Sequence, residues 1–314
     1  MKTNKLFSTL HKKIIFFFSL LLLFGVLMPS MLQSENSMLS PSNTTDMKPL
    51  PLAESTAIHI DGFNASIQWD DYPQITGSGT EGDPYLIKDL HIDAWGVGDC
   101  IFIENTNAHF RIENCTLHNT TLFGYAIRIE DASNGVIFNN TMYDTYYGVN
   151  AYNVNNIWIN QNNMSYNHYG LRVGGNNYNI TNNIIHHNSY NALRLHSGSN
   201  SIIFNNTITE HNDTGGGYNG IEVDGYTNLN ITENYVLSTR YHGITVTTSS
   251  NINIGNNTFI DNKNGMVFTD CTGDLSVFNN SVSDPLLMGI DIDNSYGIDF
   301  SNNSIQGEIG RAHV

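Results

Sequence analysis

The chain has 314 residues, of which 40% are hydrophobic, so it is large enough for a sizeable core, and disorder over most of its length is excluded. Only 13% of the residues are charged, and Asn, Gly, Thr, Ser and Tyr are abundant, a composition that favours strands and turns over helices. The formal net charge of −16 repels phosphate backbones and anionic lipids, which excludes nucleic acid as an expected partner and leaves neutral glycans and cations.

The first 56 residues are expected to lie outside the folded body. Lysines in the first 13 residues precede an apolar run from Ile14 to Met28, which is typical of a signal peptide over residues 1–30. The run is shorter than the roughly 20 residues that span a bilayer. Residues 31–56 are rich in Ser, Asn, Pro and Thr and indicate a flexible linker. We therefore expect an extracellular or cell-surface protein, with membrane attachment only through an uncleaved signal or a missing C-terminal anchor.

Residues 57–99 come before the regular repeat described next. A solenoid needs its terminal strand edges covered, so we predict that this segment forms the N-terminal cap and the first coil.

A repeated unit dominates residues 100–307. It consists of I-x-I, a polar turn, I-x-N-N-x-I and a polar segment that usually ends in Gly, as in Ile127-Arg128-Ile129 followed by Ile137-Phe138-Asn139-Asn140. The period is close to 23 residues. The second Asn of each unit falls at Asn114, Asn140, Asn163, Asn183, Asn206, Asn234, Asn257, Asn280 and Asn303.

The alternation of apolar and polar residues predicts short strands that each bury one face. Two or three such strands per unit leave no room for a helix, and the missing Leu signature argues against a leucine-rich repeat. We predict an all-β fold, a right-handed parallel β-helix of about nine coils, in which the repeated Asn residues stack as a ladder. The Gly at the end of most units, replaced once by Asn191, is expected to supply a positive φ.

Two motifs in the cap strengthen this interpretation. Gly77-Ser78-Gly79-Thr80 and Asp83-Pro84-Tyr85-Leu86-Ile87, together with the I-x-N-N-x-I units, resemble the NosD-like family of carbohydrate-binding and sugar-hydrolase β-helix repeats. The resemblance covers roughly residues 57–305. It implies the fold, whereas the family's functions include glycan binding, polysaccharide catalysis and copper-enzyme maturation. No catalytic motif of the family is present to transfer.

The middle residue of each I-x-I strand should point outward, as should the residue two positions later. This places Arg172, Arg194, His196, Glu222 and Asp224 in one patch. The residues could be simple cross-strand pairs, Arg194 with Glu222 and His196 with Asp224. Alternatively, the two carboxylates could hydrolyse a glycoside, or the basic residues could serve a lyase or epimerase acting on uronates.

An aromatic residue lies one or two positions before the end of nearly every unit. The column begins at Phe123, and its candidate carbohydrate-binding members are Tyr147, Tyr169, Tyr190, Tyr218 and Tyr241. Exposed rings in this arrangement could stack on pyranose faces. The alternative is a column of rings that pack only against one another.

No cofactor is required by any of these functions. His168, His186, His187, His211 and His242 fall in loops without regular spacing, and imidazole is a favoured copper ligand. Ca²⁺ could bind among carboxylates at the C-terminal end, for which Asp291 and Asp293 are weak candidates. Three cysteines, Cys100, Cys115 and Cys271, are expected to be isolated thiols.

Residues 308–314 break the repeat. Their sequence matches the translation of a common sequencing-library adapter, so we expect that they are not native and that the true C-terminus is missing. For the body of the chain, which we expect to be a monomer, a glycan-binding module, a polysaccharide lyase, epimerase or hydrolase, and a passive surface or adhesive scaffold all remain open.

Overall fold

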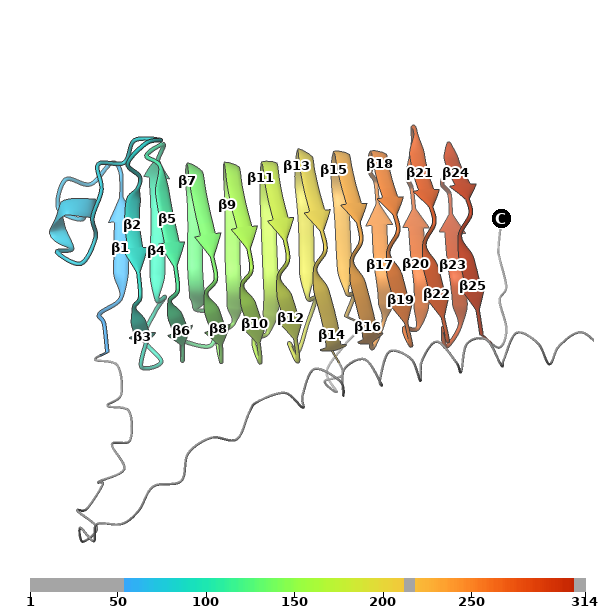
Figure 1. Cartoon of the computed structure of the whole chain (residues 1–314), viewed down its shortest axis with the longest axis horizontal. Helices are drawn as coiled ribbons and strands as arrows, with labels where there is room; N and C mark the ends of the chain where they lie inside the picture. Colours follow the sequence, from blue (N-terminus) through green and yellow to red (C-terminus); the bar gives the residue numbers. More distant parts are fainter. Residues whose placement is uncertain (1–53, 212–217, 308–314) are drawn as a thin grey trace, which may run out of the picture. The chain divides into compact units, whose positions relative to one another are not determined.

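The computed structural model describes residues 54–211 and 218–307, and the side chain of His211 is also outside the description. The predicted signal peptide, most of the linker and residues 308–314 therefore lie outside the described residues. Within them the chain forms 25 strands and one 3₁₀ helix, η1 (Trp69–Asp71), in a solenoid with three faces (Figure 1). No helix in these ranges is long and apolar enough to cross a membrane.

Face 1 is formed by the first strand of each coil. Its order is β1 (Ile58–Asp61), β4 (Ile101–Thr106), β7 (Tyr125–Phe138), β9 (Tyr147–Asn160), β11 (Tyr169–Thr181), β13 (Leu193–Phe204), β15 (Ile221–Thr232), β17 (His242–Thr247), β20 (Asn264–Thr269) and β23 (Met288–Asp293).

Face 2 continues the same sheet around a bend. It contains β2 (Tyr85–Lys88), β5 (Phe110–Glu113), the C-terminal halves of the five long strands β7 to β15, and then β18 (Ser250–Gly255), β21 (Leu275–Phe278) and β24 (Ile298–Ser301).

Face 3 is a separate sheet of ten short strands. They are β3 (His91–Asp93), β6 (Thr116–His118), β8 (Thr141–Tyr143), β10 (Asn163–Ser165), β12 (Ile184–His186), β14 (Thr207–His211), β16 (Tyr235–Thr239), β19 (Thr258–Ile260), β22 (Ser281–Ser283) and β25 (Ser304–Gln306). All pairings between named strands are parallel, for example Met142 with Met164 and then Ile185, which confirms the predicted fold.

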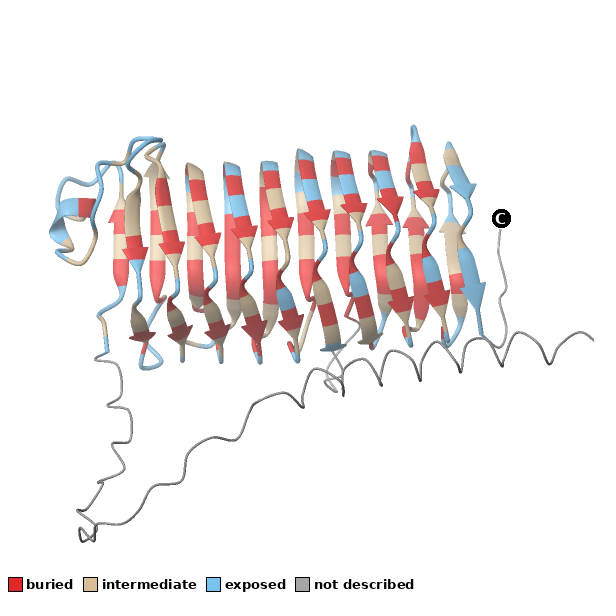
Figure 2. Ribbon diagram, viewed as in Figure 1, coloured by how far each residue is buried: buried red, intermediate tan, exposed pale blue. Residues whose placement is uncertain are grey.

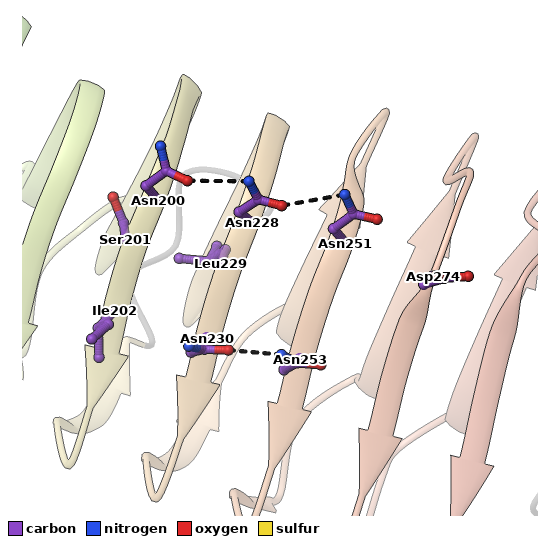
Figure 3. Close-up of a pocket in the computed structure, with 9 residues that line it drawn as sticks. All are labelled: Asn200, Ser201, Ile202, Asn228, Leu229, Asn230, Asn251, Asn253 and Asp274. Atoms are coloured by element: carbon purple, nitrogen blue, oxygen red, sulfur yellow. Dashed lines mark hydrogen bonds between the residues drawn. The ribbon is translucent and has the colours of Figure 1, made fainter.

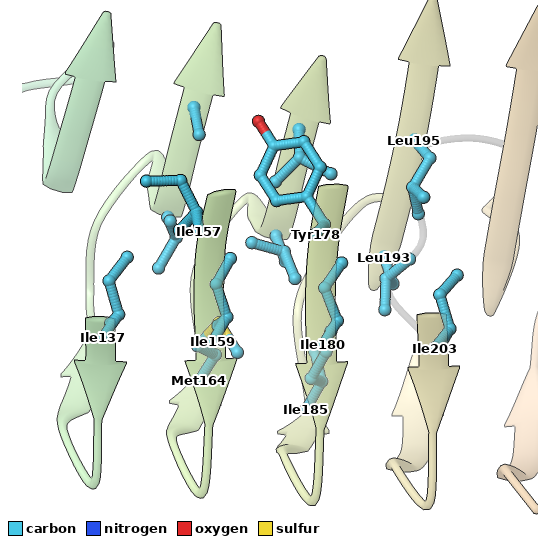
Figure 4. Packing of buried hydrophobic residues seen from close by; sticks show 14 of the residues in the cluster. Ile137, Ile157, Ile159, Met164, Tyr178, Ile180, Ile185, Leu193, Leu195 and Ile203 are labelled. Atoms are coloured by element: carbon cyan, nitrogen blue, oxygen red, sulfur yellow. The ribbon is translucent and has the colours of Figure 1, made fainter. Parts of the chain in front are cut away.

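Apolar side chains from all three faces fill the interior (Figure 4). Ile137, Ile159, Ile180 and Ile203 repeat at one position of successive coils, and all four are fully buried. Buried and exposed positions alternate along most strands, as the period-2 pattern predicts (Figure 2). At the N-terminal end, Trp69 of η1 stacks on Tyr85 with 4.4 Å between ring centroids and covers the first coils.

The buried Asn ladder runs through Asn140, Asn162, Asn183, Asn206, Asn234, Asn257 and Asn280, and ends at Asn303. Each amide oxygen accepts the backbone N–H of the preceding coil's ladder residue. Two predicted members are wrong by one residue: Cys115 stands where Asn114 was expected, and Asn162 replaces Asn163. The predicted residues are set one position away from the ladder, and Asn114 is exposed.

The predicted role of the glycines is also wrong. The repeated glycines, such as Gly148 and Gly170, do not have positive φ. Most of the described residues that do have positive φ are Asn or Asp. Gly is required because the coils approach closely: a Cβ at Gly148 would lie 2.5 Å from the carbonyl oxygen of Gly170. In this row both Ala126 and Ala192 stand in place of Gly, and Asn191 does not.

The three cysteines are free, as predicted, and all three are buried. Burial raises the pKa of Cys100 to about 12 and that of Cys115 to about 11, so these thiols are unreactive at neutral pH.

Candidate functional site on the outer side of face 1

The outward rows of face 1 have the register predicted from the sequence. One row runs Asn150, Arg172, Arg194, Glu222 and Thr245, and the parallel row runs Tyr152, Gly174, His196, Asp224 and Thr247. Strands β11, β13 and β15 therefore bring the five predicted catalytic candidates together. Adjacent coils lie about 4.8 Å apart.

Glu222 is held firmly at one end of this patch. Its Oε1 lies 3.0 Å from Nε of Arg194, and its Oε2 accepts hydrogen bonds from Nδ2 of Asn191 at 2.7 Å and of Asn219 at 3.0 Å. The predicted Arg194–Glu222 pair is thus confirmed. This contact is an ion pair by distance, but its angle does not meet the criteria of a hydrogen bond. The buried Nε of Arg194 therefore has no hydrogen-bond acceptor among the described residues.

Arg172 differs from the other arginines of its row. Arg128 pairs with Glu130 at 2.9 Å and Arg194 with Glu222, but Arg172 forms no ion pair within residues 54–211 and 218–307. Its Nε is buried and has no hydrogen-bond partner there. A guanidinium carries five N–H donors in a planar fork that fits a carboxylate. Arg172 is therefore available to an external anion.

His196 completes the basic part of the patch. Its ring leans over Gly174, where a Cβ would lie only 2.6 Å from Cε1 of His196. Tyr152, 55% exposed, stands on the other side with 6.3 Å between ring centroids. Burial and the charges of Arg172 and Arg194 lower the pKa of His196 to about 4, so the imidazole is neutral at physiological pH.

Asp224 does not pair with His196, although the two residues are neighbours in the sheet. Its Oδ1 accepts a hydrogen bond from the Thr248 hydroxyl at 2.9 Å. Glu222 and Asp224 are thus both engaged by other side chains.

The tyrosine column packs mainly against itself. Tyr125, Tyr147 and Tyr169 are stacked, with centroid separations of 4.9 and 4.7 Å, and Tyr190 and Tyr218 follow at 4.6 and 4.5 Å in a tilted arrangement. Tyr218 is buried, whereas Tyr241 is 37% exposed and lies beneath the Lys263 ammonium at 3.8 Å.

The first member of the column was misassigned. Tyr125 aligns with Tyr147, and the exposed Phe123 contacts Tyr146 instead. Because the faces of Tyr147 and Tyr169 are covered by neighbouring rings, mainly their edges and hydroxyls remain for contact with a ligand.

Sequence reasoning considered the outward rows of face 1 alone and missed Trp158 on face 2. Trp158 is 57% exposed. The signal was present, because a Trp between Ile157 and Ile159 must point away from the core.

Two family models match the chain. The model described as a right handed beta helix region matches residues 165–305, and the model described as periplasmic copper-binding protein (NosD) matches residues 75–218. Each match covers a little less than half of the chain, and together with the coil geometry they support a right-handed parallel β-helix. This chain is a right-handed parallel β-helix protein. The resemblance drawn from the cap motifs and the I-x-N-N-x-I units is confirmed.

The β-helix protein also resembles several solved structures. The N-terminal fragment of bacteriophage Phi29 gene product 12 has a TM-score of 0.59 and 17% identity, covering 75% of this chain and 46% of that one. Full-length tailspike protein 2 from Escherichia coli O157:H7 bacteriophage CAB120 has a TM-score of 0.54 and 16% identity, covering 69% of this chain and 34% of that one. A mutant of the periplasmic alginate epimerase AlgG has a TM-score of 0.50 and 12% identity, covering 71% of this chain and 85% of that one. These likenesses show the fold. Among curated protein sequences, none matches.

The predicted histidine ligands of the β-helix protein can be compared only in part, because the side chain of His211 lies outside the described residues. No three His, Cys, Asp or Glu side chains gather as a metal-binding group in the part of the chain that the structure describes. His186 and His187 contact each other through Nδ1 at 2.8 Å, and His187 pairs with Glu210 at 2.7 Å. The Ca²⁺ candidates Asp291 and Asp293 align with Val267 and Thr269, so the adjacent strand adds no further carboxylate.

Proposed function

We propose that this chain is an exported protein that binds an acidic, uronate-containing polysaccharide along the outer side of face 1. The observation that carries the proposal is Arg172, a half-buried cation without a carboxylate partner among the described residues. A guanidinium that, among the described residues, has a tyrosine hydroxyl but no carboxylate beside it, and whose buried Nε makes no hydrogen bond, is costly to maintain unless an anion binds there.

The surroundings of Arg172 suit a sugar carboxylate. The net charge of −16 over the whole chain repels an anionic polymer, and the guanidinium groups of Arg172 and Arg194 oppose that repulsion locally. Arg194 lies one coil away, and its position is fixed by Glu222. His196 is neutral, so its ring can donate a hydrogen bond to a sugar hydroxyl or accept one from it without adding charge. Two tyrosines border the same groups: the Tyr147 hydroxyl is in hydrogen-bond contact with Arg172, and Tyr169 lies close enough to Arg194 for its charge to act on the phenol.

The repeat of the fold also supports a polymer rather than a small ligand. Outward positions recur about every 4.8 Å along the solenoid, so successive sugars meet successive coils. Tyr190 and Tyr241 extend the border of the site in the same direction, whereas the buried Tyr218 only supports the column between them. Similarity to a periplasmic alginate epimerase is consistent with a uronate ligand.

A second function, epimerisation or lyase cleavage of the bound uronate, is favoured by one observation. A neutral imidazole beside two guanidinium groups can accept a proton while the cations stabilise the developing negative charge. New products in the binding assay, and their loss in His196→Gln with binding retained, would support this function.

The test is calorimetric titration with hexameric oligouronates. Arg172→Gln should weaken binding by about ten- to a hundredfold, because a charge-assisted hydrogen bond is lost. Lys88→Gln, an exposed cation at the edge of face 2, is the matched control and should bind as the native chain does. If the native chain binds no oligouronate, or if Arg172→Gln binds equally well, the proposal fails and a passive scaffold becomes the better account.

A further inference from the structure

Face 2 carries a shallow hollow of about 650 Å³ that lies away from the Arg172 patch. Figure 3 shows that it is lined largely by amides: Asn200, Asn228 and Asn251 form one row and Asn230 and Asn253 a second. Ile202, which is exposed, adds an apolar contact, whereas Leu229 is buried in the core.

The amides of the hollow are prearranged for hydrogen bonding. Nδ2 of Asn251 donates to Oδ1 of Asn228 at 3.2 Å, and Nδ2 of Asn228 donates to Oδ1 of Asn200 at 3.1 Å. In the second row, Asn253 donates to Asn230 at 2.8 Å. Each amide has two N–H groups and two oxygen lone pairs, so every coil keeps donors and acceptors for a ligand.

An exposed tryptophan continues the second row. Strand pairing aligns Trp158, Asn179, Ile202, Asn230 and Asn253 on five successive coils. Trp158 is 57% exposed, and Oδ1 of Asn179 beside it is buried without a hydrogen-bond partner. Such an orphaned acceptor indicates that a donor is missing at this point.

This stretch of face 2 is uncharged. The outward rows between Asn134 and Asn253 contain Asn, Thr, Gly and apolar or aromatic residues, and the charged residues of these rows, such as Arg111 and Asp274, lie at the two ends. This contrasts with face 1, whose centre holds the Arg172 patch.

We infer that face 2 is a second glycan-binding surface, specific for a neutral polysaccharide. A pyranose ring stacks on Trp158, a sugar hydroxyl hydrogen-bonds to the half-buried amide of Asn179, and the chain continues over Ile202 into the amide rows. A protein partner would require a larger apolar patch than Trp158 and Ile202 provide. Hydroxyl groups spaced along a polymer match amides that repeat about every 4.8 Å.

The inference is tested with the full chain and neutral hexasaccharides, namely cellohexaose, mannohexaose and xylohexaose, in calorimetric titrations. At least one should bind, and Trp158→Ala should weaken that binding by about tenfold, the effect of one lost aromatic contact. Trp95→Ala removes another exposed tryptophan, 69% exposed in the cap, and is the matched control that should not change the affinity.

The two surfaces can be told apart with the same variants. Arg172→Gln should bind the neutral hexasaccharide as the native chain does and bind the oligouronate more weakly. Trp158→Ala should bind the oligouronate as the native chain does and bind the neutral hexasaccharide more weakly. Thermal unfolding of each variant establishes that it is folded. The inference is overturned if no neutral hexasaccharide binds the native chain, or if Trp158→Ala and Trp95→Ala have equal effects.

Discussion

At the residue scale, the ladder asparagines connect each coil to the next through buried amides. Asn206 donates from its backbone N–H and from Nδ2 to Oδ1 of Asn234 at 3.0 and 2.9 Å, and its own Oδ1 accepts both corresponding groups of Asn183. Nδ2 also donates to the carbonyl oxygen of Ile180 at 3.0 Å. The side chain is buried, so water cannot replace these bonds in the folded state.

Replacing Asn206 by Ala should therefore lower the free energy of unfolding by about 1–3 kcal/mol. Asn253→Ala is the matched control, because this amide also bonds the preceding coil but is exposed. The control, like a change at the outward Thr245, should have a much smaller effect. Denaturant unfolding measures the difference, and equal losses would contradict the assignment of inward and outward positions.

His196 should make stability depend on pH. Its pKa falls from 6.5 to about 4 on folding, through burial and the two nearby arginines. Between these values the unfolded chain binds the proton and the folded chain does not, so stability is lost as the pH falls from 6.5 towards 4. His242, whose pKa burial and Lys263 also lower to about 4, contributes in the same direction.

His196→Gln should consequently lose less stability than the native chain between pH 6.5 and 4, as measured by thermal unfolding. Arg172→Gln should raise the pKa of His196, which NMR titration of the imidazole would show. An unchanged pKa in that variant would mean that Arg172 does not act on the ring.

At the element scale, the tyrosine stack stabilises the edge of face 1. Tyr169 lies between Tyr147 and Tyr190 with centroid separations of 4.7 and 4.6 Å. Tyr169→Ala should cost about 1–3 kcal/mol, since it removes two ring contacts and leaves a gap in the stack. Tyr152→Ala, which removes an exposed ring from the neighbouring strand, should cost less than about 1 kcal/mol. Comparable losses in the two variants would show that the stack adds nothing to stability.

The elements themselves could be predicted because the alternation of Ile and Val with polar residues reports burial directly. The ladder errors arose from counting Asn-Asn pairs. The buried apolar residue three positions earlier marks the ladder residue correctly, as Ile159 does for Asn162 and Ile112 for Cys115. Ring orientation in the tyrosine column depends on contacts between coils, which a single strand's pattern does not contain.

At the scale of the whole molecule, protection of the core is uneven along the solenoid. The N-terminal coils are covered by the Trp69 cap, whereas β24 and β25 in the last described coil are largely exposed, including Phe300 at 36% and Ile305 at 44% (Figure 2).

Amide hydrogen exchange should therefore be slowest in β9 to β15 and fastest in β24 and β25, because each coil is stabilised by its neighbours. Mass spectrometry of the native chain measures this gradient. Uniform protection along the solenoid would contradict it.

The central claim, a polymer bound coil by coil across the Arg172 patch, is tested most directly by oligouronates of increasing length. Affinity should rise from the dimer to the hexamer, because each added sugar reaches outward groups on the next coil about 4.8 Å away. In Arg172→Gln the affinity should fall at every length. Affinity that is independent of length in the native chain, or no binding at all, would contradict the account.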